Sequence, residues 1–186
     1  TTNPAHDTRP IWSPDGKHIA YISDATGETE IWLHPVNGGD DIQLTTNNDT
    51  YIRNLTWSND SKSILYTDRK NRAVMVDVES KTKRTILTNP AGEIPLPKFS
   101  PDNKWITYTK TEANDMRVVY VYSFEQNKEY AITERWYDSG QPTFSTDGKY
   151  LFFTSSRDFN PIYSSVEWNF AYSQMDCIYF VTLAAD

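Results

Sequence analysis

The stretch WSPDGKHIAYIS at residues 12–23 recurs three more times along the chain. The copies are WSNDSKSILYTD (57–68), FSPDNKWITYTK (99–110) and FSTDGKYLFFTS (144–155), and all align without gaps. Each copy has an aromatic residue, a short polar stretch with an aspartate, and a run of apolar and β-branched residues. Such a run is typical of a β-strand, and the polar stretch is typical of a tight turn, so each copy predicts a β-hairpin.

The turn of each copy is predicted to be structural. Its aspartates are Asp15, Asp60, Asp102 and Asp147, and the residues that follow them are Gly16, Ser61, Asn103 and Gly148. Gly and Asn accept the positive φ that such a turn requires. Serine fits this requirement least, so we expect a variant turn in the second copy. A residue that recurs in every repeat indicates a role in folding, since a functional site would break the symmetry.

The spacing of the copies predicts the architecture. They begin 45, 42 and 45 residues apart, which matches the period of one four-stranded propeller blade. Third strands are expected at 31–36, 74–78, 119–124 and 178–183, and fourth strands are expected to end near Leu44, Leu87 and Ile132, each followed by Thr. We therefore predict an all-β fold, a β-propeller of four-stranded antiparallel blades, with blades at 7–45, 52–88, 95–133 and 140–186.

The strand register also predicts how much of a propeller is present. The chain begins after an expected fourth strand, and its last blade lacks the outer strand. Propellers have about four to eight blades, so four blades are compatible with a small closed ring. Because neither terminus supplies the missing strand, we favour one segment, residues 1–186, of a larger propeller. Cut blade surfaces of this kind can also form oligomers.

Charge and composition exclude several classes of function. The formal net charge is -7 and no Lys/Arg-rich run is present, which argues against a nucleic-acid partner. No stretch reaches the roughly 18 apolar residues of a membrane span. Cys177 is the single cysteine, so an intrachain disulfide is excluded. No cofactor is expected.

Metal and catalytic patterns are weak. No His or Cys pair has zinc-like spacing, and the acidic residues Glu28, Glu30, Asp40 and Asp41 lack the EF-hand pattern. We expect these acidic residues on solvated turns or on an edge strand. No G-x-S-x-G elbow is present, and His6, His18 and His34 are not expected to be catalytic. Paired carboxylates of a glycosidase are defined by their separation in space, so a glycan-hydrolase propeller remains an alternative.

The link after the second strand of blade four breaks the regular period. It runs from about Ser155 to Asp176 and is rich in Phe, Tyr and Trp, and residues 168–175 are compatible with a short helix. A long link in a compact domain is usually functional or disordered, and the aromatic content argues against disorder. It is either a lid that packs on a blade or a docking surface. The candidate contacts are Arg157, Phe159, Tyr163, Trp168 and Tyr172, with Trp136, Tyr137 and Asp138 as neighbours.

The repeated W/F-S-P-D-G-K, followed by I-A-Y/F, resembles the TolB/tricorn-type (PD40, WD40-like) propeller repeat. The Gly-His and Trp-Asp signature of WD40 repeats does not recur. The stretch SRDFNPIYSSVEWNFAYSQM (156–175), followed by IYFVTL, resembles the amino-terminal propeller of bacterial tricorn-like serine proteases. That family joins propellers, a PDZ-like module and a serine peptidase domain in one polypeptide.

The resemblance implies a non-catalytic propeller domain for peptide gating or interdomain scaffolding. The family's catalytic residues lie in a later domain, and none has a matching position here. Partners would be peptides, proteins or other domains of the same polypeptide. The alternative is a stand-alone TolB-like interaction propeller of the cell envelope. Related bacterial proteins are often exported, which favours the periplasm.

Overall fold

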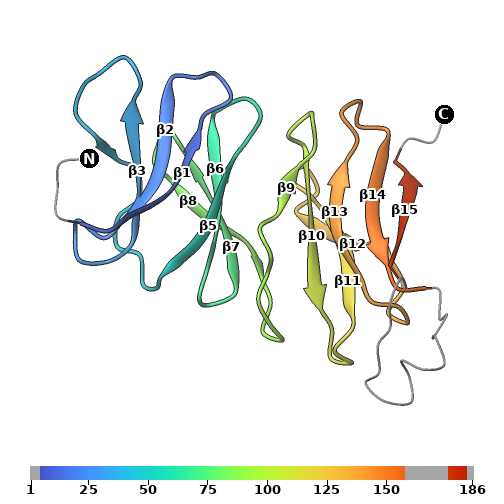
Figure 1. Ribbon diagram of the computed structural model, residues 1–186. Helices are drawn as coiled ribbons and strands as arrows, with labels where there is room; N and C mark the ends of the chain where they lie inside the picture. The colour runs from blue at the N-terminus through green and yellow to red at the C-terminus, as the bar shows by residue number, and fades with distance from the viewer. Residues whose placement is uncertain (1–4, 158–175, 184–186) are drawn as a thin grey trace, which may run out of the picture. The chain divides into compact units, whose positions relative to one another are not determined.

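The chain folds into antiparallel β-sheets joined by turns and loops (Figure 1). The computed structural model describes residues 5–157 and 176–183, and no helix occurs among them. The chain divides into two compact units, residues 1–97 and residues 98–186, and each unit contains two sheets. The expected all-β class is thus confirmed. The described part of the chain has no helix with the length and apolarity needed to cross a membrane.

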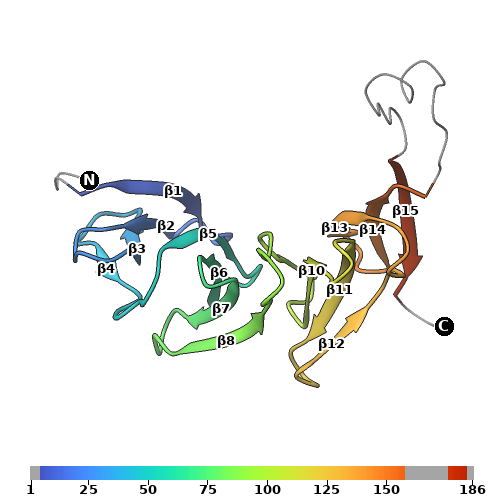
Figure 2. The same ribbon diagram turned by 90° about the horizontal axis from the view of Figure 1, so that it is seen from below.

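The first unit contains two four-stranded sheets. Their strands are β1 (Asp7–Trp12), β2 (His18–Ser23), β3 (Glu30–Pro35) and β4 (Ile42–Gln43), then β5 (Ile52–Trp57), β6 (Ser63–Asp68), β7 (Arg72–Asp77) and β8 (Lys83–Thr88). Strands that follow one another in sequence are neighbours in the sheet, and every pair is antiparallel. Figure 2 shows the order β5, β6, β7, β8 from one edge of the sheet to the other. Each sheet is therefore a four-stranded meander, as expected of a blade.

The second unit repeats this pattern with one difference. Its strands are β9 (Lys98–Phe99), β10 (Trp105–Thr111), β11 (Arg117–Ser123), β12 (Lys128–Ala131), β13 (Ser139–Phe144), β14 (Tyr150–Ser155) and β15 (Cys177–Thr182). The sheet β9–β12 has four strands, whereas the sheet β13–β15 has three among the described residues. The candidate helix at residues 168–175 lies outside the residues that the structure describes.

One hydrogen-bond pattern closes all four repeat turns. A serine Oγ donates to the aspartate Oδ1 at 2.6 Å, and the backbone N–H two residues after the aspartate donates to the same oxygen at 3.0–3.1 Å. The residue directly after the aspartate has φ between +57° and +72° in every copy. The variant turn expected at Ser61 is wrong, because Ser61 has φ +59° and the second turn makes the same bonds. The Ser61 Oγ also accepts the Asp15 N–H at 3.0 Å, which helps to offset the cost of positive φ.

The core of each unit lies between its two sheets. In the first unit, Ala20 and Leu33 of one sheet pack with Trp57, Ile64 and Val76 of the other. In the second unit, β11 contributes Val119 and Val121, and β14 contributes Leu151 and Phe153. These residues alternate along their strands, because successive side chains of a strand point to opposite faces. Alternation thus places one face of each sheet against its partner within the unit.

Glu30 corrects the prediction that the acidic residues are solvated. Its side chain is 2% exposed and accepts hydrogen bonds from Thr45 Oγ1 at 2.5 Å and from the Asn48 N–H at 2.8 Å. A buried carboxylate is tolerated when such bonds replace its hydration. Glu28 is exposed, as expected. Asp41 is half-buried and accepts hydrogen bonds from Tyr21 Oη and His34 Nδ1.

Candidate functional site

Two segments that were predicted to be neighbours meet at one end of the sheet β13–β15. One is the loop before β13 with Trp136, Tyr137 and Asp138, and the other follows β14 and contains Arg157. The Ser156 N–H donates to the Asp138 carbonyl oxygen at 3.0 Å, and Ser155 Oγ donates to the same oxygen at 3.2 Å. These bonds fix the two segments to each other.

Arg157 is the centre of an aromatic cluster. Its guanidinium carbon lies 5.0 Å from the ring centroid of Tyr179, 5.6 Å from that of Tyr137 and 5.9 Å from that of Phe153. Arg157 Nε donates to Ser155 Oγ at 3.3 Å. A cation over an aromatic face is stabilised by about 0.5–2 kcal/mol, depending on how far it is removed from water. We call Arg157, Tyr137, Phe153 and Tyr179 the arginine cluster.

Asp138 is held by Arg117 at the start of β11. Arg117 Nε lies 2.9 Å from Asp138 Oδ1 and 3.0 Å from Oδ2, and Arg117 Nη2 also contacts Oδ2. The Arg117 N–H donates to Asp138 Oδ1 at 2.9 Å. The hydrogen bonds from the Arg117 side chain lower the pKa of Asp138 below its ordinary value, although partial burial opposes this. Asp138 therefore stays ionised at neutral pH and ties the loop to the neighbouring sheet.

The loop carries its aromatic residues at the surface. The Trp136 side chain is 81% exposed, and Tyr137 is exposed while one face of its ring meets Arg157. Asn114 Nδ2 donates to the Arg135 carbonyl oxygen at 2.9 Å, which anchors the backbone just before Trp136. An exposed indole on an anchored loop suits the binding of a peptide or of another protein surface. The remaining candidates, Phe159, Tyr163, Trp168 and Tyr172, lie outside the described residues.

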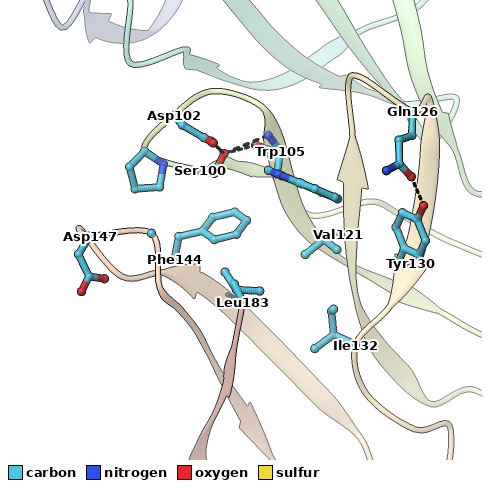
Figure 3. A pocket seen from close by; sticks show the side chains of 12 residues that line it. Ser100, Asp102, Trp105, Val121, Gln126, Tyr130, Ile132, Phe144, Asp147 and Leu183 are labelled. Carbon is cyan, nitrogen blue, oxygen red and sulfur yellow. Dashed lines mark hydrogen bonds between the residues drawn. The ribbon is translucent and has the colours of Figure 1, made fainter. Parts of the chain in front are cut away.

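A cavity of about 490 Å³ lies elsewhere in the second unit. Figure 3 shows the apolar side chains of Trp105, Val121, Ile132, Phe144 and Leu183 around it. Tyr130 Oη donates to Gln126 Oε1 at one side, and the Ser100 and Asp102 side chains of a repeat turn lie at another. The cavity was not predicted, because the repeat alignment does not show that turns and strands of the two sheets enclose a space.

The described residues contain no group of three or more His, Cys, Asp or Glu side chains arranged to hold a metal ion. His34 Nδ1 lies 2.7 Å from Asp41 Oδ1, and the Tyr21 hydroxyl donates to the other oxygen of the same carboxylate. In a serine hydrolase a serine hydroxyl lies next to the histidine, whereas here the hydroxyl is that of a tyrosine and contacts the aspartate.

A family model confirms the tricorn-type identification. The model of the tricorn protease second beta propeller domain matches residues 1–186. The expected resemblance was to the amino-terminal propeller, whereas the matching model describes the second propeller.

Two curated relatives are much longer than this chain. The uncharacterized peptidase YuxL of Bacillus subtilis (strain 168) is 31% identical over 150 residues, which are 80% of this chain and 22% of the relative. Tricorn protease homolog 1 of Streptomyces coelicolor is 23% identical over 176 residues, or 92% of this chain and 16% of the relative. The chain thus spans less than a quarter of the length of either protein.

A solved structure supports the fold. The crystal structure of the tricorn protease matches with a TM-score of 0.87 at 19% sequence identity, and the match covers 98% of this chain and 18% of that chain. At this identity the likeness concerns the fold alone, and it confirms the predicted β-propeller architecture.

Proposed function

Because the chain belongs to the family of the second β-propeller domain of tricorn protease, we propose that it is a non-catalytic domain of a tricorn-like serine protease. In this role it receives peptides for a peptidase domain of the same polypeptide, or holds the neighbouring domains in place. The observation that carries the proposal is the family match over the whole chain.

The surface around Trp136 supports peptide recognition. Tryptophan, tyrosine and arginine are the residues that most often dominate binding energy at protein interfaces. Here the exposed Trp136 lies next to Tyr137, whose ring meets the guanidinium group of Arg157. The bonds between Arg117 and Asp138 hold the loop before a ligand arrives. Such preorganisation reduces the entropy that is lost on binding.

Fluorescence anisotropy with labelled, unstructured peptides tests the binding role. Trp136→Ala is expected to weaken binding about tenfold, as loss of an aromatic anchor does. Trp12→Ala is the matched control, because Trp12 is also exposed, at 60%, but lies on β1 of the first unit. Equal effects of the two substitutions, or none, would contradict a binding role for the Trp136 loop.

A second measurement tests the proposal that this domain is non-catalytic. Incubation of the purified chain with the same peptides, followed by mass spectrometry, is expected to show no cleavage. Cleavage that co-purifies with the chain, and that a substitution in the described residues abolishes, would overturn this part of the proposal.

A further inference from the structure

Two arginines at the Trp136 loop, which joins β12 to β13, are paired with carboxylates of the same unit. Arg117 Nε lies 2.9 Å from Asp138 Oδ1 and 3.0 Å from Oδ2. Arg135 Nε lies 3.5 Å from Glu112 Oε2. The positive charge of each guanidinium group is therefore compensated within the protein.

The pair of Arg135 and Glu112 belongs to a wider network. The Tyr120 hydroxyl donates to Glu112 Oε1, and this bond fixes the carboxylate next to the arginine. A third arginine near the loop, Arg157, has its guanidinium group over the aromatic rings of the arginine cluster. None of the three arginines thus presents an uncompensated and uncovered cation to a ligand of this surface.

Carboxylates beside the loop remain exposed. Glu134 is exposed two residues before Trp136, and Asp115 is exposed in the turn between β10 and β11. This turn lies against the loop, because Asn114 Nδ2 donates to the Arg135 carbonyl oxygen at 2.9 Å. Neither Glu134 nor Asp115 forms an ion pair with a described residue.

An exposed indole with carboxylates nearby is complementary to a cation. The Trp136 ring is exposed, and the face of an indole attracts a guanidinium or ammonium group more strongly than other aromatic side chains do. Opposite charges around such a contact discriminate between partners. The net charge of -7 also attracts cationic partners at longer range.

We propose that the Trp136 loop selects peptides that carry a basic side chain. The basic group lies on the Trp136 indole, and Glu134 and Asp115 supply the opposite charge. This inference rests on the peptide-binding role proposed above and adds the charge class of the peptide. Arginine is the best probe, because its planar group stacks on aromatic rings and is more weakly hydrated than an ammonium group.

Two labelled, unstructured peptides that differ at one position test the charge selection. One carries arginine and the other carries citrulline, which has nearly the same shape but no charge. In low salt, fluorescence anisotropy should show about tenfold tighter binding of the arginine peptide to the purified chain. The difference should shrink at about 1 M salt, where the Debye length is only about 3 Å.

A double variant of the protein, Glu134→Gln with Asp115→Asn, removes both carboxylates. Asparagine tolerates the φ of +62° at position 115. The preference for the arginine peptide should fall to about threefold, with the affinity for the citrulline peptide unchanged. The matched control is Glu28→Gln with Asp40→Asn, which removes two exposed carboxylates of the first unit and should keep the full preference.

Trp136→Ala separates this inference from the binding role itself. It should weaken binding of the arginine peptide more than binding of the citrulline peptide. If the unaltered protein binds both peptides equally and Trp136→Ala weakens both, the charge selection is wrong and the binding role stands. If both double variants lose the preference equally, overall charge is the cause and the assignment to the loop is wrong. If Trp136→Ala affects neither peptide, the binding role and the charge selection fail together.

Discussion

At the scale of single residues, the second repeat turn shows how hydrogen bonds override a weak local preference. Serine has a low intrinsic preference for φ +59°, yet Ser61 adopts it. The Asp60 carboxylate accepts from Ser58 Oγ and the Lys62 N–H, and these bonds close the turn. The sequence predicted the turn and its aspartate, but not the Asp15–Ser61 bond, which joins residues 46 positions apart.

We predict that Ser61→Ala is less stable than Ser61→Gly by about 1 kcal/mol. Both changes remove the hydroxyl that accepts the Asp15 N–H. Only alanine keeps a Cβ at positive φ, so the difference isolates the backbone cost. Urea denaturation of the two variants measures it. Equal free energies of unfolding would show that the turn relaxes away from this conformation.

The second residue-scale prediction concerns pH. Arg117 lowers the pKa of Asp138 in the folded protein, so the pair stabilises the fold fully above the unfolded pKa of about 3.9. This stability is lost as the pH falls through the lower, folded pKa. Asp138→Asn should therefore cost about 1 kcal/mol at neutral pH, a modest value because Arg117 is half exposed.

Thermal unfolding of the wild type and Asp138→Asn across the acidic range measures this effect. The gap between their midpoints should shrink as the pH falls below about 4. A gap that stays constant with pH would mean that the ion pair does not contribute.

At the scale of elements, a threonine after the fourth strand holds that strand in two of the sheets, since Thr45 Oγ1 accepts the Ile31 N–H and Thr133 Oγ1 accepts the Val119 N–H. β4 has two residues, yet Thr45 holds both Ile31 and the buried Glu30. The periodic pattern placed the first and second strands of every sheet well, since each first strand ends at its aromatic residue. The pattern could not predict that Glu30 is buried, because Thr45, which donates a hydrogen bond to the Glu30 carboxylate, follows a different strand.

Thr45→Val should destabilise the chain by about 2–3 kcal/mol, and Thr133→Val by about 1 kcal/mol. Both remove the acceptor of a buried backbone N–H. Only Thr45 also donates to a buried carboxylate, which its loss would leave under-satisfied. Chemical denaturation of both variants compares them. A larger effect at Thr133 would contradict this account of the two threonines.

The candidate site was predicted in part. The sequence singled out Tyr137, Asp138 and Arg157 as neighbours, because their segments flank strands of one blade. It did not predict Arg117 or Tyr179 as their partners. Those contacts depend on how β11 and β15 lie beside the two segments, and no local pattern records such an arrangement.

At the scale of the whole molecule, family membership and the surface chemistry support the same function. The chain carries the repeat of a tricorn-type propeller, and its described residues form a preorganised aromatic surface. If this domain receives peptides, a substitution in it should change the cleavage of substrates that are long enough to reach both this domain and a peptidase domain. Its substitutions should leave short substrates unaffected, because these need contact only the peptidase site.

The most direct measurement compares long and short peptide substrates of the full polypeptide that contains this chain. For Trp136→Ala, kcat/KM for a long peptide should fall about tenfold, whereas kcat/KM for a short fluorogenic peptide should not change. Trp12→Ala should change neither value. An equal fall for both substrates, or no change for either, would contradict a peptide-receiving role for this domain.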